Sequence, residues 1–245
     1  MRAPKAYTEA LSQAYDERHF GGKSGQHILE RDCSALWSLL DGTYSYVLDV
    51  PCGSGIYSQM MADRGHRVVA ADASLPMLEL VRRLGRAEST VHSDIEHLPF
   101  PDDSFDATVT LRMFSHCPKD AVVRGLRELG RVIRPGGRVI FDTFRWTPRR
   151  WPLARRVLDQ NCIYVVSPRE VEKSIEDAGL LKIESRSLYI FSPLLQRRMP
   201  LMLVRGFTAL EALLPPPWRL RTFWACTKES PATVGTSRVP PMGSP

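Results

Sequence analysis

The chain has 245 residues, of which 43% are apolar and 24% are charged, and its formal net charge is +6. This length and composition suit a single α/β domain with a sizeable core. No uninterrupted apolar run approaches about 18 residues, and no apolar leader with a cleavage site is recognisable; we therefore expect a cytoplasmic protein without a membrane span. The five cysteines are scattered and form no Cys-x-x-Cys pair, which argues against a disulfide framework or a structural zinc site.

Two helices are predicted before the first strand, over residues 5–18 and 25–40, with a flexible glycine-containing loop at 19–25 between them. Strands and helices then alternate, and hydrophobic periodicity together with turn residues sets their limits. The predicted order is strand 46–50, helix 56–64, strand 67–72, helix 75–84, strand 89–92, strand 105–112, helix 119–133 and strand 138–144. This alternation predicts a parallel sheet with right-handed crossovers.

The last third of the chain is predicted to hold one more helix, at 167–179, and two strands, at 182–191 and 220–228. Ser167, Pro168 and Glu170 match the cap, first and third positions of a helix with a capping box. Residues 192–218 form a long insertion between the two strands, and a prolyl run at 215–217 ends its helical pattern. Residues 229–245 are rich in Pro, Ser and Gly, which predicts a disordered tail.

Three predicted strands each deliver an acid to the same edge of the sheet. Asp49 ends the first strand and is followed at once by a turn that contains Gly53 and Gly55; Asp72 ends the second strand and Asp94 follows the third. Ligands of open α/β sheets bind at the carboxyl ends of the strands, and an acid one βα unit after a glycine turn typically accepts hydrogen bonds from ribose hydroxyls. A single acid of this kind is often only a helix cap, but three in register favour a nucleoside ligand.

These segments resemble the class I S-adenosylmethionine-dependent methyltransferases, in particular the branch that includes the ubiquinone-type enzymes. The resemblance covers roughly residues 40–145 closely. The segments that carry it are Val47-Leu48-Asp49-Val50-Pro51-Cys52-Gly53-Ser54-Gly55, Ala71-Asp72-Ala73-Ser74, the acidic block at residues 94–106, and residues 129–140 around Pro135-Gly136-Gly137. The resemblance implies a Rossmann-like, seven-stranded, mostly parallel sheet with helices on both faces and an antiparallel final strand.

The resemblance also implies a role for each residue that matches its motifs. Asp49 and residues 51–55 (Pro51, Cys52, Gly53, Ser54 and Gly55) would hold the methionine part of S-adenosylmethionine. Asp72, with Ala73, would bind the ribose, and Asp94 with Ile95 would face the adenine. Met77 would pack beside the adenine ring or serve as ordinary helix core, and Arg112 lies where the family lines the sulfonium pocket. Residues 1–45 would cap this site, and residues 46–228 would form the methyltransferase domain.

The predicted activity is methyl transfer to a small-molecule acceptor, with oxygen as the favoured acceptor atom. Transfer from a sulfonium needs mainly alignment, and a hydroxyl or acidic carbon also needs a base. His116, just after the fourth strand, is the candidate base, and it equally fits a residue that only shapes the pocket or caps the next helix. Tyr15 and His19 are candidates to contact the acceptor. One alternative is a nicotinamide-dependent oxidoreductase, although Ser58 stands where the glycine fingerprint of that class has its third glycine. The other alternative is a protein that binds S-adenosylmethionine without catalysing a reaction.

Charge is unevenly divided along the chain. Residues 1–144 hold 17 Lys/Arg and 19 Asp/Glu, whereas residues 145–228 hold 15 and 7. The excess of basic residues at 145–228 fits a solvated face, a site for an anionic acceptor, or a surface that contacts an acidic membrane. Nucleic acid is disfavoured as a partner, because the segment lacks the aromatic residues interspersed among basic ones that are typical of RNA-binding modules. The apolar insertion fits a packing helix, a lid over a partly hydrophobic biosynthetic intermediate, or, more weakly, a membrane-surface helix. The sequence does not fix the oligomeric state.

Overall fold

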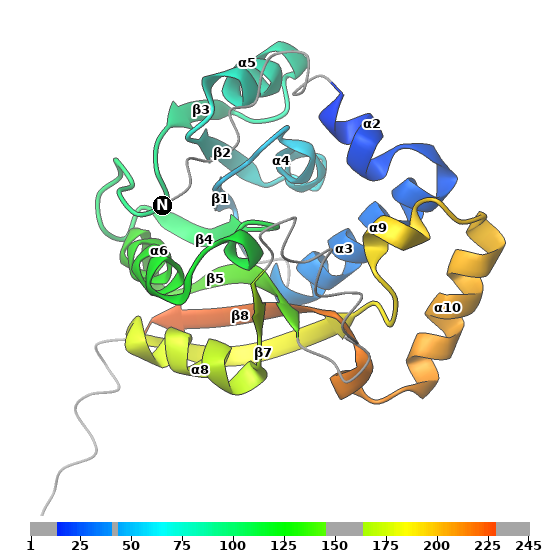
Figure 1. Cartoon of the computed structure of the whole chain (residues 1–245). Coiled ribbons are helices and arrows are strands. Elements are labelled where there is room, and N and C mark those ends of the chain that lie inside the picture. The colour runs from blue at the N-terminus through cyan, green and yellow to red at the C-terminus, as the bar shows by residue number, and fades with distance from the viewer. Residues whose placement is uncertain (1–13, 41–43, 146–163, 229–245) are drawn as a thin grey trace, which may run out of the picture.

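The computed structural model of the chain describes residues 14–40, 44–145 and 164–228 (Figure 1). The α-helices in these ranges are α2 (Tyr15–Phe20), α3 (Gly22–Leu40), α4 (Ile56–Ala62), α5 (Leu75–Leu84), α6 (Lys119–Val132), α8 (Pro168–Asp177), α9 (Pro193–Gln196) and α10 (Leu201–Leu213). The strands are β1 (Tyr46–Asp49), β2 (Arg67–Asp72), β3 (Ser89–His92), β4 (Phe105–Thr110), β5 (Ile133–Arg145), β6 (Val165–Val166), β7 (Leu180–Leu188) and β8 (Arg221–Lys228). Two short 3-10 helices, η1 (Phe114–His116) and η2 (Pro216–Trp218), complete the described elements.

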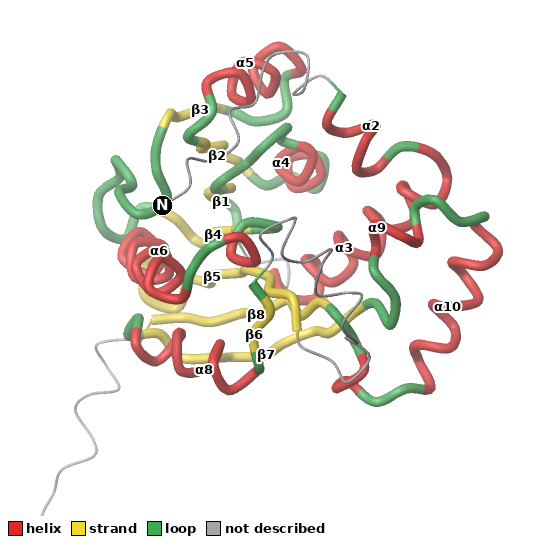
Figure 2. The backbone as a smooth tube through the Cα atoms, viewed as in Figure 1, coloured by secondary structure: helices red, strands yellow, loops and turns green. Residues whose placement is uncertain are grey.

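The strands form one sheet in the order β3-β2-β1-β4-β5-β8-β7, with the two-residue β6 added beside β5. Strands β1 to β5 pair in parallel, whereas β8 runs antiparallel to both of its neighbours, β5 and β7. This arrangement confirms the predicted Rossmann-like sheet of seven main strands with an antiparallel final strand. Figure 2 shows helices on both sides of that sheet.

Side chains of the central strands alternate between two cores because successive residues of a strand point to opposite faces. Val47 packs with α3 and α4 on one face, and its neighbour Leu48 packs with α6 and α8 on the other. Ile140 and Phe141 of β5 divide in the same way. A strand covered on both faces tolerates a continuous apolar run, and this is why the segments from 46 to 48 and from 68 to 71 lack the alternating pattern of a half-exposed strand.

The helix at the start of the C-terminal part has the predicted cap. The Ser167 Oγ accepts from the Glu170 N–H at 3.3 Å, and the Glu170 carboxylate accepts from the Ser167 N–H at 2.7 Å. These reciprocal bonds satisfy two backbone donors that the first turn of α8 leaves without an intrahelical partner. The predicted capping box is confirmed.

The predicted flexible loop at residues 19–25 is wrong, because helix occupies almost all of it. Helix α2 continues to Phe20, and α3 begins at Gly22. The Phe20 ring is 5% exposed and packs edge-on against the ring of Tyr57, and the Ser24 hydroxyl donates to the Met199 carbonyl at 2.7 Å. Tertiary packing on both sides of the turn thus outweighs the low helix propensity of its glycines.

Helices α9 and α10 lie at one side of the molecule, against α3 (Figure 1). They occupy the insertion predicted at residues 192–218, and Val204 and Glu211 are the buried residues of α10. No helix within the described ranges is both long and apolar enough to cross a bilayer. The predicted tail at 229–245 and most of the predicted helix at 5–18 lie outside the described residues.

Candidate cofactor and acceptor site

The carboxyl edge of the sheet holds the glycine turn between β1 and α4. The Cys52 N–H donates to the Ala71 carbonyl at 2.8 Å, so the turn is fastened to the neighbouring strand β2. The Gly53 N–H donates to the Asp72 carboxylate, also at 2.8 Å. The turn after β1 is therefore bonded directly to the end of β2.

Both glycines of the turn have left-handed backbone conformations, but their surroundings differ. Gly53 has φ of 52°, and a Cβ built on it would meet nothing within 4 Å. Gly55 has φ of 75°, and a Cβ there would lie 2.7 Å from a methyl group of Val81. Gly53 thus keeps open space against the main chain, whereas Gly55 allows α5 to pack closely on the turn.

This difference predicts that alanine at Gly55 mainly lowers stability, whereas alanine at Gly53 mainly weakens cofactor binding. Gly55→Ala adds a clash with Val81 to the strain of a left-handed residue and should lower the free energy of unfolding by about 2–4 kcal/mol. Gly53→Ala carries only the conformational strain, about 1–2 kcal/mol, but its methyl group fills the open space and should weaken cofactor binding at least tenfold. Thermal denaturation and calorimetric titration of the two variants check both effects. Equal losses of stability would contradict the assignment.

Asp72 holds the turn together. One of its oxygens accepts from the Gly53 N–H and the other from the Ser74 N–H, each at 2.8 Å. Burial raises the pKa of this carboxyl, and the hydrogen bonds from Ser74 and Gly53 offset part of that rise. The carboxylate keeps two further lone pairs that can accept from hydroxyl groups, as the ribose role requires.

Asp49, at the end of β1, is more deeply buried, with 2% of its surface exposed. The Ser58 hydroxyl donates to its carboxylate at 2.5 Å. The pKa of Asp49 is raised to about 7: burial and the nearby charge of Asp72 raise it, and the Ser58 hydrogen bond offsets part of the rise. A carboxyl poised in this way favours a cationic ligand, because a nearby positive charge stabilises its ionised form.

The other residues expected at the cofactor divide into exposed and buried groups. Asp94 and Ala73 are exposed, and the Asp94 carboxylate accepts from the Glu96 N–H at 3.0 Å. Ile95 and Met77 are buried, with 4% and 1% of their surfaces exposed. For Met77 the structure supports the interpretation as helix core. Its place beside an adenine ring stays a prediction.

The turn residues Pro51, Cys52 and Ser54 are half-buried or buried. Pro51 is half-buried, while Cys52 and Ser54 are 6% and 1% exposed. Burial raises the pKa of the Cys52 thiol well above its usual value, with the charges of Asp49 and Asp72 acting in the same direction. The thiol is therefore un-ionised, and its small size is what the turn uses.

Helix α2 is tied across the glycine turn by a contact that the sequence reasoning missed. The Ser54 hydroxyl donates to one Asp16 oxygen at 2.5 Å, and Arg86 donates to the other at 2.6 Å. Arg86 also donates to the Ser54 carbonyl at 2.8 Å. An acid in the predicted N-terminal helix, next to Tyr15, was the available signal for this contact.

Tyr15, His19 and Arg112 lie close together. The rings of Tyr15 and His19 lie 4.1 Å apart, and the His19 Nδ1 lies 2.9 Å from the Tyr15 carbonyl oxygen. The Arg112 guanidinium lies over the Phe20 ring at 5.0 Å. Burial lowers the pKa of His19 to about 4, and the charges of Arg112 and Arg197 lower it further, so this imidazole is neutral and weakly basic. Three guanidinium groups, those of Arg18, Arg112 and Arg197, lie close enough to His19 to affect its charge.

His116 ends η1, just beyond the carboxyl end of β4, and it is exposed. Its backbone N–H donates to the Met113 carbonyl at 2.7 Å. Helix α6 begins three residues later, at Lys119. The position fits a base at the rim or a residue that only shapes the pocket. The predicted alternative of a cap for the next helix is wrong, because the N-cap of α6 is Pro118.

A buried ionic network beneath this rim was also missed. The Arg221 guanidinium donates to Asp32 and to Asp142, each at 2.6 Å, and all three side chains are at most 4% exposed. Tyr57 and Tyr189 donate their hydroxyls to Asp32 at 2.8 and 2.6 Å. Burial alone would lower the pKa of Arg221, but the charges of Asp142 and Asp32 hold it well above its usual value.

The network reaches the candidate site through the main chain. The Arg112 N–H donates to Asp142 at 2.5 Å, and Arg112 has φ of 65°. A carboxylate bonded to the chain at this point holds Arg112 in a conformation that non-glycine residues seldom adopt. Charged residues inside apolar segments, such as Asp32 on a helix face and Asp142 and Arg221 within strands, were the sequence signal for this network, because such residues are seldom buried without a partner.

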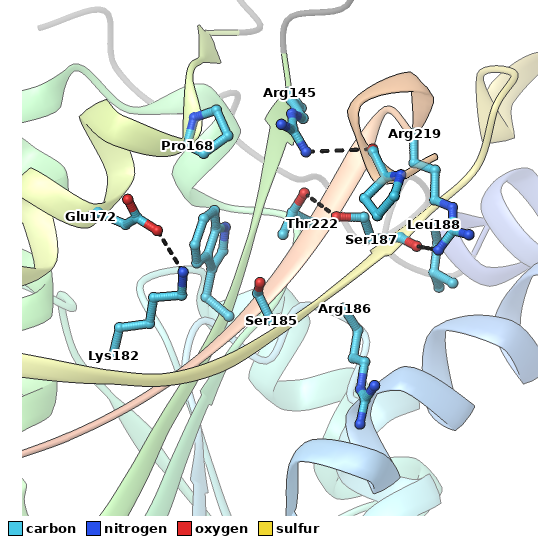
Figure 3. Close-up of a pocket in the computed structure, with 12 residues that line it drawn as sticks. Arg145, Pro168, Glu172, Lys182, Ser185, Arg186, Ser187, Leu188, Arg219 and Thr222 are labelled. Atoms are coloured by element: carbon cyan, nitrogen blue, oxygen red, sulfur yellow. Dashed lines mark hydrogen bonds and ion pairs between the residues drawn. The ribbon is translucent and has the colours of Figure 1, made fainter. Parts of the chain in front are cut away.

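A hollow in the described part of the chain lies elsewhere. It has a volume of about 400 Å³, runs along β7 and β8 between α8 and η2, and is lined by basic side chains that include Arg145, Lys182 and Arg219 (Figure 3). Lys182 pairs with Glu172 across it, and Arg219 donates to the Ser187 carbonyl. None of the predicted site residues lines this groove, which is part of the basic face anticipated for residues 145–228.

Comparisons with known proteins agree with the fold and with the glycine turn. Residues 48–141 match the family described as "Methyltransferase domain". The malonyl-(acyl-carrier protein) O-methyltransferase of Erwinia pyrifoliae is 40% identical over 121 residues, which cover 48% of this chain and 45% of that protein. The demethylmenaquinone methyltransferase of Clavibacter sepedonicus is 40% identical over 116 residues, covering 46% of each. The chain thus spans about half the length of the curated relatives that it matches.

Among solved structures, phosphoethanolamine N-methyltransferase 2 of Haemonchus contortus superposes with a TM-score of 0.65 at 18% identity, covering 92% of this chain and 58% of that one. At this identity the likeness establishes the fold. Residues 48–141, which contain the turn, Asp72 and Asp94, also match the methyltransferase-domain family by sequence. The resemblance to class I methyltransferases is therefore confirmed for this part of the chain.

Proposed function

We propose that the protein is an S-adenosylmethionine-dependent methyltransferase that acts on a small-molecule acceptor, with oxygen as the acceptor atom. The observation that carries the proposal is the glycine turn. There is open space beside the Cα of Gly53, and the Gly53 N–H donates to Asp72, the acid predicted to bind ribose hydroxyls. The methyltransferase-domain match over the same residues supports it, as do the names of the two relatives.

The residues present fit this cofactor. Asp49, buried with a raised pKa, suits the cationic methionine end of the molecule, and Asp72 suits the ribose hydroxyls. Asp94, exposed one strand further along, is placed for the adenine. When bound, S-adenosylmethionine supplies a methyl group already activated by its sulfonium. Asp16, bonded to Ser54, supports the proposal that the N-terminal helices cap the site.

The chain's own tasks are then alignment and proton transfer. Tyr15 and His19 would position the acceptor beside the strand ends, and Arg112 would line the sulfonium pocket. Holding the two reactants together in this way is the main source of rate acceleration. His116 would remove the proton of an acceptor hydroxyl, since histidine is the side chain most often used as a general base near neutral pH. His19, with a pKa of about 4, is too weak a base to be preferred.

The alternative of a nicotinamide-dependent oxidoreductase is disfavoured by a specific contact. The position of its third glycine holds Ser58, whose side chain is fully buried and whose hydroxyl donates to Asp49. Close helix–strand packing through a glycine is what that fingerprint needs here. A protein that binds the cofactor without turning it over is distinguished only by activity.

The experiment that tests the proposal is incubation with S-adenosylmethionine labelled in its methyl group, together with fractionated pools of hydroxyl- and carboxyl-bearing metabolites. We expect label in one small-molecule product, with S-adenosylhomocysteine formed in equal amount. The Gly53→Ala variant is the control for background transfer. Cofactor binding without label transfer to any pool would favour the non-catalytic alternative.

Asp49 makes cofactor affinity depend on pH. In the free protein its carboxyl has a pKa of about 7, so below that pH the site must lose a proton before it can pair with a cationic ligand. The α-amino group of the cofactor stays protonated up to about pH 7.7. Affinity should therefore rise up to about tenfold per pH unit between about pH 5.5 and 7, and then level off. Calorimetry in buffers of different ionisation enthalpy should detect one released proton, and Asp49→Asn should lose most of the pH dependence.

A further inference from the structure

The arm formed by residues 192–219, which comprises α9, α10 and η2, carries most of the exposed apolar surface. Eleven large apolar side chains are exposed among the described residues, and six of them lie on this arm: Leu195, Met202, Leu203, Leu210, Leu213 and Trp218. Met202 and Leu213 have 85% and 81% of their surfaces exposed. Such a concentration marks a surface that contacts something other than water.

The contacts of α10 show which of its faces is turned outward. Val204 is buried, Thr208 lies 3.4 Å from His27, and Glu211 pairs with Arg31 of α3 at 2.7 Å. These positions, four and seven residues apart, form one stripe of the helix against α3. At 3.6 residues per turn, Met202 and Leu213 lie on the side opposite Val204. Their side chains are therefore turned away from the protein and do not line its interior.

The charges of the arm are almost all positive. Its only acid is Glu211, which is 4% exposed and neutralised by Arg31. Arg198 and Arg205 are exposed on the same segment, and Arg219 donates to backbone carbonyls next to η2. The outer surface of the arm thus combines long aliphatic side chains and a tryptophan with guanidinium groups, and it presents no carboxylate of its own.

We propose that this arm docks on the surface of an anionic membrane, with α10 lying in the plane of the interface. A helix with an apolar outer face flanked by basic residues binds lipid by burying that face and by attracting acidic headgroups. Arginine side chains also extend to the headgroups from a partly inserted helix, and tryptophan prefers the interface. A protein partner would need a pocket of fixed shape that is complementary to the arm. A lipid headgroup layer has no fixed shape and accommodates exposed Leu, Met and Arg side chains together.

Docking would also bring the candidate site close to the bilayer. Arg197 directly follows α9. It lies close enough to His19 for its charge to lower the pKa of that histidine, as the charge of Arg112 also does. Only the short segment between α9 and α10 therefore separates the proposed membrane-binding helix from the part of the site proposed to hold the acceptor. An acceptor with a hydrophobic part could enter from the lipid phase. The membrane proposal itself does not depend on the enzyme activity, because binding is measured without substrate.

The test is flotation of the full chain with vesicles of phosphatidylcholine alone and of phosphatidylcholine with an equal amount of phosphatidylglycerol. We expect binding to the anionic vesicles that is at least tenfold tighter than to the neutral ones and that weakens as salt is raised. The double variant Met202→Glu/Leu213→Glu should weaken binding at least tenfold, and Arg205→Glu at least about fivefold.

Matched controls come from other exposed positions. Leu84 on α5 is 48% exposed, and Arg169 on α8 is also exposed; Leu84→Glu and Arg169→Glu should leave vesicle binding unchanged. Circular dichroism and melting temperature establish that the arm variants are folded. Absence of binding to anionic vesicles, or equal losses in arm and control variants, would overturn the proposal. A dimer in light scattering that dissociates on Leu213→Glu would assign the surface to a second copy of the chain instead.

Discussion

Replacing Asp32 by alanine is expected to lower the free energy of unfolding by about 3–5 kcal/mol, because it leaves Arg221 buried with one of its two carboxylate partners removed. Arg221 is 4% exposed and Asp32 is fully buried. The same change also removes the acceptor of the Tyr57 and Tyr189 hydroxyls. For a domain of this size the loss corresponds to a fall in melting temperature of roughly 6–20 °C.

Differential scanning calorimetry of Asp32→Ala and of Asp63→Ala measures this effect. Asp63 is exposed and its carboxylate accepts a hydrogen bond from Gln59 at 3.1 Å, so its removal should cost less than about 0.5 kcal/mol. A change in melting temperature of similar size for both variants would mean that the buried network adds nothing to stability. The network is then better described as a device that orients β5 and β8.

Replacing His116 by alanine is expected to lower turnover by roughly 10²–10⁴-fold if this imidazole removes the acceptor proton. His116 is exposed on η1, so the substitution should leave the fold and the affinity for S-adenosylmethionine near those of the unmodified protein. With S-adenosylmethionine saturating, so that protonation of Asp49 does not limit binding, the acidic limb of the pH profile of kcat/KM for the acceptor should disappear as well, since it reports the base.

Steady-state kinetics of His116→Ala, with His27→Ala as the matched control, separate this role from a structural one. His27 lies on α3, and its ring makes two long contacts, 3.4 Å to Thr208 and 3.7 Å to Glu30. A loss below tenfold for His116→Ala, with the pH profile unchanged, would show that the residue only shapes the pocket. Alignment by the bound molecules would then account for catalysis.

The sheet is predictable from the sequence because each of its strands has a clear local pattern. Apolar runs such as 46–48 and 68–71 end at acids, and the Ser167–Glu170 capping box marks α8. The acids at the strand ends follow from the topology alone, since parallel strands deliver their carboxyl ends to one edge. For this reason the sequence alone suffices to place Asp49, Asp72 and the glycine turn together.

The contacts between distant segments could not be predicted in this way. Asp16 binds Ser54 across 38 positions of the chain, and Asp32 binds Arg221 across 189. Sequence periodicity reports which face of an element is buried, but it does not identify the partner of a charged residue on that face. The prediction of a loop at 19–25 failed for the same reason, because the burial of Phe20 depends on α4.

The insertion shows a further limit. The composition of its apolar residues fits core cover, a lid and a surface helix alike. Only the partners of Thr208 and Glu211 establish which stripe of α10 faces α3. The exposed positions of Met202 and Leu213 then follow. A role of the arm in covering an acceptor remains a prediction.

Calorimetric titration of the full chain with S-adenosylmethionine, S-adenosylhomocysteine and NAD tests most directly whether the glycine turn holds the proposed cofactor. We expect both S-adenosyl compounds to bind with one-to-one stoichiometry and micromolar dissociation constants, NAD to show no binding, and Asp72→Ala to weaken the first two by about 1–3 kcal/mol through loss of a charged acceptor. Binding of NAD without binding of S-adenosylmethionine would contradict the assignment.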